Sequence, residues 1–264
     1  MDNRNVFVAI ALSLAVLLFW GAFFETPKPI GTNDNFNVSK TQNKKNSENE
    51  NITPNINQTE LPTTVSREES INNTKRIKID NDKIKGSISL QGGIFDDLSF
   101  KAYKKEIDIN DNVVFLNPKD TEDGFFVETG WTSIGNKINV PTINSVWSVI
   151  GNSTLSVNKP IILEWNNKEG IIFRKKIELD EKYLFKINQE IQNNTNKAIE
   201  LYPYAQITRN KKPDDVMGFY ILHEGFIGVF DEELKEDDYD DIEDKKIVRE
   251  ADNGWLGITD KYWL

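Results

Sequence analysis

The chain opens with one continuous apolar run and then changes to short, alternating patterns. Residues 6–24 carry no charge and have Ser13 as their single polar side chain. About 20 apolar residues are needed to cross roughly 30 Å of bilayer hydrocarbon. The run therefore predicts a transmembrane helix over residues 6–24, preceded by a cytoplasmic tail of residues 1–5. Trp20, near the outer end of the run, fits an interfacial anchor.

A cleaved signal peptide is the alternative interpretation of this run. Signal peptides have a shorter apolar region of about 7–15 residues, followed by small residues at the cleavage site. Here Trp20 stands two positions before Ala22, and Phe23 and Phe24 occupy places where small residues are required. An uncleaved anchor is therefore favoured. Because long hydrophilic segments translocate largely regardless of charge, we expect everything after Glu25 to lie outside.

Residues 25–75 have a different character. They are rich in Asn, Thr, Ser, Lys and Glu and contain a single aromatic residue, Phe36. Such a composition buries too little apolar surface to offset the conformational entropy lost on ordering. We expect a flexible, disordered linker between the anchor and the rest of the chain.

From Arg76 the apolar positions recur with a period of two. The runs are rich in β-branched and aromatic residues and are separated by turn residues such as Gly92-Gly93 and Asn117-Pro118. They cover residues 76–79, 84–90, 113–116, 125–128, 146–150, 161–165, 171–179, 183–191, 199–208 and 219–230. This spacing predicts an all-β, antiparallel sandwich of two large packed sheets over residues 76–250.

One run has an interruption in its alternation. Ile171 and Phe173 are separated from Ile177 and Leu179 by the charged residues 174–176. We interpret this as a change of phase, and expect a bulge or strong twist that restores the apolar face.

Composition and charge exclude several classes of protein. The 264 residues include 32 Lys+Arg and 42 Asp+Glu, for a formal net charge of -10, with no Cys. Disulfides, thiolate nucleophiles and Cys-ligated metals are therefore excluded, and the acidic balance argues against a nucleic-acid partner. Ten acidic residues and one Lys fall within residues 231–244. This stretch predicts a solvated loop between two strands, with contact to a partner or to divalent cations as the alternative.

Catalytic chemistry has few candidates. His223 is the only histidine, and its neighbour Glu224 would point to the opposite face of a strand. Multi-histidine zinc sites are excluded, and Gly92-Gly93 is not followed by a phosphate-loop signature. We therefore expect no enzyme, no catalytic residue, no metal and no cofactor, and a structural or surface role for His223. Non-catalytic ligand binding in a sandwich groove stays open.

The last residues, 251–264, break the alternating pattern. Trp255, Ile258 and Tyr262 fall at the i, i+3 and i+7 positions of a helix, and Trp263 widens the same face. Aromatic amphipathy of this kind is typical of a membrane interface. We therefore expect an interfacial amphipathic helix that binds the lipid bilayer through Trp255, Ile258, Tyr262 and Trp263.

Several motifs resemble one known family. They are MDNRN at residues 1–5, SLQGG at 89–93, YKK at 103–105, LYPY at 201–204, YILHEG at 220–225 and GWLGITDKYW at 254–263. Together they are similar to YidC-type membrane protein insertases of Gram-negative bacteria, particularly the alphaproteobacterial members. The resemblance covers both ends and most of the β region but not the linker.

The resemblance implies an inner-membrane protein whose first helix runs from cytoplasm to periplasm and carries a large periplasmic β-super-sandwich. In that family, a bundle of five transmembrane helices with a hydrophilic, Arg-containing groove then inserts nascent membrane proteins, alone or with the Sec translocon and its accessory subunits. This sequence stops at Leu264, before a second span. We therefore expect the N-terminal part of an insertase and chaperone without its insertase core. The alternative is a single-span periplasmic module that binds a carbohydrate or an envelope protein.

Overall fold

The computed structural model describes residues 64–105, 110–214, 216, 223–243, 245–260 and 263. The predicted transmembrane helix over 6–24, Trp20, Tyr262 and most of the predicted linker lie outside the described residues. Within the described part of the chain, no helix combines the length and apolarity that a membrane crossing requires.

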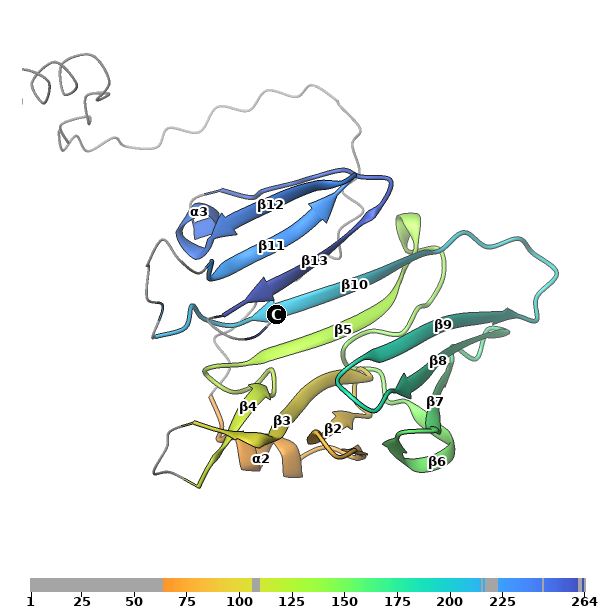
Figure 1. The fold of residues 1–264 in the computed structure, drawn as a ribbon. Coiled ribbons are helices and arrows are strands. Elements are labelled where there is room, and N and C mark those ends of the chain that lie inside the picture. Colours follow the sequence, from red (N-terminus) through yellow and green to blue (C-terminus); the bar gives the residue numbers. More distant parts are fainter. Residues whose placement is uncertain are drawn as a thin grey trace, which may run out of the picture. The chain divides into compact units, whose positions relative to one another are not determined.

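The described residues are mostly β-strands (Figure 1). The strands are β1 (Arg76–Asp80), β2 (Ile84–Ser89), β3 (Ile94–Lys104), β4 (Asn112–Leu116), β5 (Phe125–Thr132), β6 (Ser148–Ser156), β7 (Lys159–Asn166), β8 (Ile171–Leu179), β9 (Phe185–Asn193), β10 (Tyr202–Arg209), β11 (Gly225–Phe230), β12 (Glu233–Asp238) and β13 (Gly254–Thr259). The helices are α2 (Arg67–Asn72), η1 (Ile134–Asn136) and α3 (Tyr239–Glu243).

Ten strands form one large sheet in the order β10-β5-β3-β2-β1-β6-β7-β8-β9, with β4 paired to β3. All of its strand pairs are antiparallel except β1–β6, which pair in parallel through Lys78↔Thr154 and Ile79↔Leu155. The β1–β6 pair therefore joins a first half, β1–β5 with β10, to a second half, β6–β9.

The two halves of the large sheet face each other across a shared core. The rings of Phe95 on β3 and Phe185 on β9 are 5.4 Å apart, and those of Trp131 on β5 and Phe173 on β8 are 5.1 Å apart. Buried aliphatic residues from both halves fill the space between: Ile77, Ile79, Ile84, Ile88, Leu155, Ile161, Leu163 and Ile177. The predicted all-β sandwich is confirmed, but its two layers belong to one continuous sheet rather than to two separate sheets.

The predicted phase change in residues 171–179 is wrong. Strand β8 alternates without interruption, and its register with β7 and β9 shows no shift. Lys175 simply occupies a core position and is 1% exposed. Its Nζ lies 3.3 Å from the Gly93 carbonyl oxygen and 4.7 Å from the centre of the Trp147 ring. The ammonium group is thus accommodated by a carbonyl and an aromatic face instead of by a bulge.

Strand β3 was not among the predicted strands because Asp96 and Asp97 interrupt its apolar pattern. Both carboxylates are buried and paired in the fold. Arg76 binds Asp96, while Asp97 accepts hydrogen bonds from Arg67 and from the Ser87 hydroxyl. Burial raises the pKa of Asp96, and the Arg76 charge opposes that rise. Paired in this way, the two acidic residues are compatible with a central strand.

Within the range predicted as a linker, residues 25–75, the structure describes a helix. Helix α2 starts after Ser66, whose hydroxyl accepts a hydrogen bond from the Glu69 N–H at 3.2 Å. Arg67 on this helix reaches Asp97 of β3, and Val65 donates its N–H to the Asp120 carbonyl at 3.2 Å. A helix of six residues has no apolar period that the sequence could reveal.

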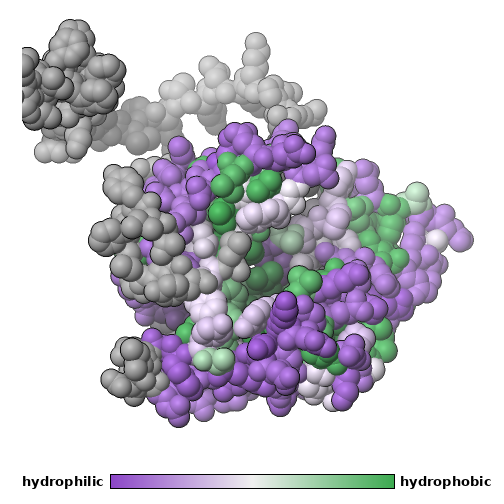
Figure 2. Space-filling view, viewed as in Figure 1, coloured by the Kyte–Doolittle hydropathy of each residue, from purple (hydrophilic) through white to green (hydrophobic). Residues whose placement is uncertain are grey.

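The remaining strands form a small sheet in the order β12-β11-β13. Most of the acidic run 231–244 forms strand β12 of this sheet and the helix α3 that follows it, rather than the predicted loop. Carboxylates remain hydrated on an exposed strand as they do in a loop, so the composition did not distinguish a strand from a loop. Figure 2 shows a largely hydrophilic surface with several separate hydrophobic areas.

Candidate functional site

The C-terminal segment is a strand, and the predicted helix over residues 251–264 is wrong for its described part. Residues Gly254–Thr259 form β13, which pairs antiparallel with β11. Trp255 and Ile258 therefore lie on opposite faces. Trp255 is 47% exposed, whereas Ile258 is 7% exposed and belongs to the core. A Cβ on Gly254 would lie 2.0 Å from the Val229 carbonyl oxygen, so the glycine permits close pairing of the strands.

After β13, the described residues Asp260 and Trp263 contact each other and the large sheet. Asp260 and Trp263 exchange two backbone hydrogen bonds, of 2.9 and 2.7 Å. Arg209, at the end of β10, donates from Nη1 to Asp260 Oδ2 at 2.6 Å and to the Tyr239 hydroxyl at 3.1 Å. Tyr239 in turn donates to Asp260 Oδ1 at 2.9 Å. We call Arg209, Tyr239, Asp260 and Trp263 the C-terminal junction.

The electrostatics of the junction favour this arrangement. Tyr239 is 6% exposed, and burial, supported by the Asp260 charge, raises the pKa of its phenol against the opposing Arg209 charge. The hydroxyl therefore stays protonated and remains a donor. The Arg209 guanidinium also lies 4.7 Å from the centre of the Phe125 ring on β5. Arg209 at the end of β10 thus contacts α3, β5 and the segment that follows β13.

Aromatic packing completes the junction. The Trp263 ring stacks on Phe100 of β3 with centroids 4.3 Å apart, and Tyr103 meets it edge-on at 4.9 Å. Trp263 therefore packs against the sandwich. Of the predicted interface residues, Ile258 and Trp263 contact protein, Trp255 is exposed, and Trp20 and Tyr262 lie outside the described residues. Contact between Trp255 and lipid stays a prediction.

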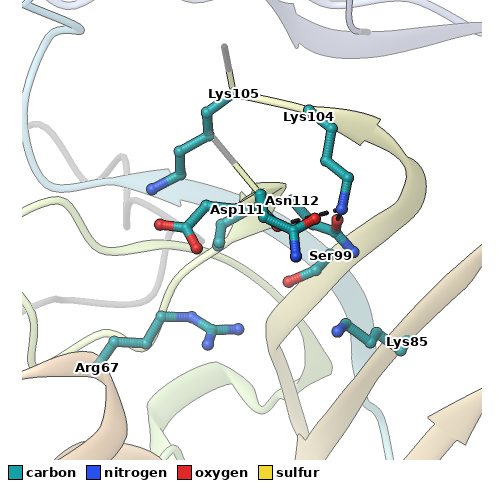
Figure 3. Close-up of a pocket in the computed structure, with 9 residues that line it drawn as sticks. Arg67, Lys85, Ser99, Lys104, Lys105, Asp111 and Asn112 are labelled. Carbon is teal, nitrogen blue, oxygen red and sulfur yellow. Dashed lines mark hydrogen bonds between the residues drawn. The ribbon is translucent and has the colours of Figure 1, made fainter. Parts of the chain in front are cut away.

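A polar hollow of about 480 Å³ lies between α2, β2, β3 and β4 (Figure 3). Its charged lining residues are Arg67, Lys85, Lys104, Lys105 and Asp111. The Lys104 ammonium donates to the side-chain oxygen of Asn112 at 2.6 Å. In the described ranges, no three His, Asp or Glu residues are grouped to hold a metal ion.

His223 has the contacts of a structural residue. Its Nε2 lies 2.9 Å from the Phe226 carbonyl oxygen, and its Nδ1 lies 3.3 Å from Asp238 Oδ1. Both ring nitrogens therefore have partners within the small sheet. Gly92 and Gly93 form a turn with φ of 77° and 61°, which agrees with the turn predicted there.

Comparison with known proteins identifies the domain that contains the junction. The family model described as the YidC periplasmic domain matches residues 76–264, from the first residue of β1 through the C-terminal junction. This chain belongs to the YidC periplasmic domain family. The resemblance seen in the motifs is therefore confirmed, and the sandwich is a periplasmic domain.

Curated YidC proteins match the whole chain. The protein named membrane protein insertase YidC of Pelagibacter ubique (strain HTCC1062) is 42% identical over 264 residues, covering 100% of this chain and 46% of that protein. Proteins of the same name from Cereibacter sphaeroides (strain ATCC 17029 / ATH 2.4.9) and Sinorhizobium medicae (strain WSM419) are 32% and 36% identical, covering 43% and 46% of their own lengths. The chain spans about half the length of these YidC relatives.

Of the four junction residues, sequence reasoning singled out Trp263 alone. Asp260 was noted only as part of the motif at 254–263, and Arg209 and Tyr239 were missed altogether. Arg209 ends an ordinary alternating strand, and Tyr239 lies inside the acidic run, where its neighbours suggest solvent. The one available signal was Tyr239 itself, the single aromatic residue within residues 231–244. An aromatic residue in such a stretch indicates a local contact with the core.

Proposed function

We propose that this chain is the N-terminal part of a YidC-type membrane protein insertase and chaperone. The whole protein helps nascent membrane proteins to insert, fold and assemble, alone or with the Sec translocon and its accessory subunits. The match of the periplasmic domain model to residues 76–264 carries this proposal. The name shared by the relatives supports it.

The proposed topology follows from the sequence pattern. Residues 6–24 anchor the chain in the inner membrane, with residues 1–5 in the cytoplasm and the sandwich in the periplasm. Trp20 and Tyr262 lie at the membrane interface in this arrangement. The apolar run and the periplasmic family of residues 76–264 support the orientation.

In this proposal the sandwich is an accessory domain and the insertase core lies in a part of the protein outside this chain. Insertion needs no bond to be made or broken. A polar groove lowers the free energy cost of moving hydrophilic segments through lipid, where unpaired polar groups are expensive. The ion pair between Arg209 and Asp260 holds the segment after β13 against the large sheet.

A chimera tests the proposal. In cells depleted of their own insertase, we compare the complete Pelagibacter protein, the same protein with this chain in place of its matching part, and this chain alone. Protease protection of a newly made membrane protein reports insertion. We expect the chimera to restore insertion and the chain alone to fail. Insertion by the chain alone, or an inactive but well-expressed chimera, would contradict the proposal.

A second comparison tests the accessory role of the sandwich. A chimera that lacks residues 30–200 is expected to keep most of the insertion activity, because this region contributes no part of the membrane groove. The matched control is a chimera in which the same number of residues is removed from the membrane-spanning core. Loss of insertion in the first deletion, at normal protein levels, would rule out a merely accessory domain.

A further inference from the structure

The two faces of the small sheet differ in their contacts. On one face, Ile258 is buried and Phe226 meets Tyr239 of α3 with ring centroids 5.8 Å apart, while Leu256 at the edge of the same face is 66% exposed. On the other face, strand register places Leu234, Val229 and Trp255 side by side in one row across the three strands. Paired residues of antiparallel strands share a face, so these side chains form a continuous apolar row.

The exposed face is more apolar than an exposed sheet face normally is. Leu234 is 54% exposed and Trp255 is 47% exposed, while Val229 between them is half-buried. Ile227, two residues before Val229 on β11, lies on the same face beside this row. Antiparallel sheets with one face in water usually carry polar residues on that face. We call Trp255, Val229, Leu234 and Ile227 the Trp255 stripe.

The charges beside the Trp255 stripe are negative. The strand register places Glu236 and Asp238 on the same face, and both are exposed. Lys235 lies on the opposite face and binds Glu233, and Arg249 is paired with Asp237 on that opposite face as well. Within β11, β12 and β13, the exposed face therefore has two carboxylates and no Lys or Arg.

This combination favours one kind of occupant. An anionic bilayer surface would be repelled by Glu236, Asp238 and the rest of the acidic run. A protein segment that presents apolar side chains together with Lys or Arg would match both the stripe and its charged border. Exposed tryptophan is also the residue type that most often carries binding energy at protein interfaces.

We propose that the Trp255 stripe is a docking surface for a basic, apolar segment of another protein. The segment lays its apolar residues on Trp255, Val229 and Leu234 and directs Lys or Arg toward Glu236 and Asp238. This docking goes beyond the insertase role and does not depend on it.

A pair of peptides tests the docking. The full chain, held in discs of neutral lipid, is titrated with a fluorescent peptide of alternating Leu and Lys and with its Leu and Glu counterpart. Fluorescence anisotropy of the peptide reports binding. We expect the Lys peptide to bind at least about tenfold more tightly than the Glu peptide, and its affinity to fall with added salt. Equal affinity for both peptides would overturn the proposal.

Variants locate the binding on the stripe. Trp255→Ser is expected to weaken binding of the Lys peptide about tenfold or more. The matched control is Leu184→Ser, because Leu184 is 68% exposed in the β8–β9 connection and is not part of the small sheet. Glu236→Gln is expected to weaken binding several-fold and to reduce its salt dependence, with Glu190→Gln as the control. Unchanged binding by Trp255→Ser, with a native circular dichroism spectrum, would overturn the proposal.

Two further measurements distinguish other occupants. Flotation of the full chain, with its anchor kept in discs of neutral lipid, together with phosphatidylglycerol vesicles tests for lipid at the stripe, and sedimentation of the discs tests for a second copy. We expect Trp255→Ser to change neither measurement. Loss of flotation in this variant would assign the stripe to lipid, and loss of self-association would assign it to a second copy.

Discussion

Lys175 is a cation in the middle of an apolar core. Burial lowers the pKa of Lys175 from 10.5 to about 8, and the Glu128 charge acts in the opposite direction. At neutral pH the side chain is therefore charged in the folded and in the unfolded chain, but the charge is costly in the fold. Its carbonyl neighbours, Gly92 and Gly93, lie at 3.4 and 3.3 Å, distances that make weak hydrogen bonds.

Replacing Lys175 with Met is expected to stabilise the domain at pH 7 by about 2 kcal/mol, because a flexible apolar side chain removes the buried charge. Between pH 8 and 10.5 the unfolded wild type binds a proton that the folded form does not. The free energy of unfolding of the wild type therefore increases as the pH rises through this range. The stability advantage of Lys175→Met over the wild type becomes smaller. Urea unfolding of Lys175→Met and of the exposed control Lys186→Met, from pH 6 to 10, measures this. A constant difference across the range would contradict the buried-charge account.

Arg76 and Asp96 form a buried ion pair, with side chains 8% and 5% exposed. Removing one partner leaves the other charge unpaired in the core, which typically costs about 3 kcal/mol or more. We expect Arg76→Met to lower the free energy of unfolding by that amount at pH 7. Lys78→Met is the matched control, because Lys78 is on the same strand with a side chain 64% exposed. Equal losses of unfolding free energy in the two variants would show that the buried ion pair contributes no more to stability than an exposed lysine.

At the scale of elements, strands were predictable where alternation was intact. Strands β1, β2 and β8 begin at their predicted residues, because Ile and Phe alternate with charged residues there. Strand β3 was missed because its two acidic residues are buried in ion pairs with partners distant in sequence. Strand β12 was missed because its acidic residues are mostly exposed and resemble those of a loop. The aromatic spacing of β13 fits a helix equally well, and only pairing with β11 decides between them.

The C-terminal junction was predictable only in part, for a related reason. The motif of residues 254–263 located the segment, but Arg209 comes from another strand and Phe100 from a third. A contact that joins three distant segments leaves no local pattern in any of them.

Asp260 is the residue on which the junction depends. Asp260→Ala removes the acceptor of both Arg209 and Tyr239, so we expect β13 and the Asp260–Trp263 backbone pair to open more often. Hydrogen exchange of residues 254–263 is expected to speed up by about tenfold, while exchange in β8 stays unchanged. Asp252→Ala is the control on the same segment. Unchanged exchange in residues 254–263 would contradict a fastening role for the junction.

At the scale of the whole molecule, the chain combines parts with different physical requirements. The apolar run of residues 6–24 is predicted to lie in lipid, and the hydrophilic linker is predicted to be solvated. The domain is stabilised by its own hydrophobic core. The acidic surplus is concentrated in residues 231–244, whereas the large sheet contains Lys175 and Arg76, whose side chains are buried. The charge and hydrophobic content of the whole chain are therefore averages, and neither average describes the anchor, the linker or the domain.

The parallel β1–β6 pair has a consequence for how the domain is made. β1 pairs with β2 almost at once during synthesis, but its other edge finds its partner only when Thr154 and Leu155 have emerged. Until then the first strands present an open edge, and closing it requires a long loop to be ordered. The growing chain therefore passes through a stage that is vulnerable to misassociation, and completion of β6 ends it.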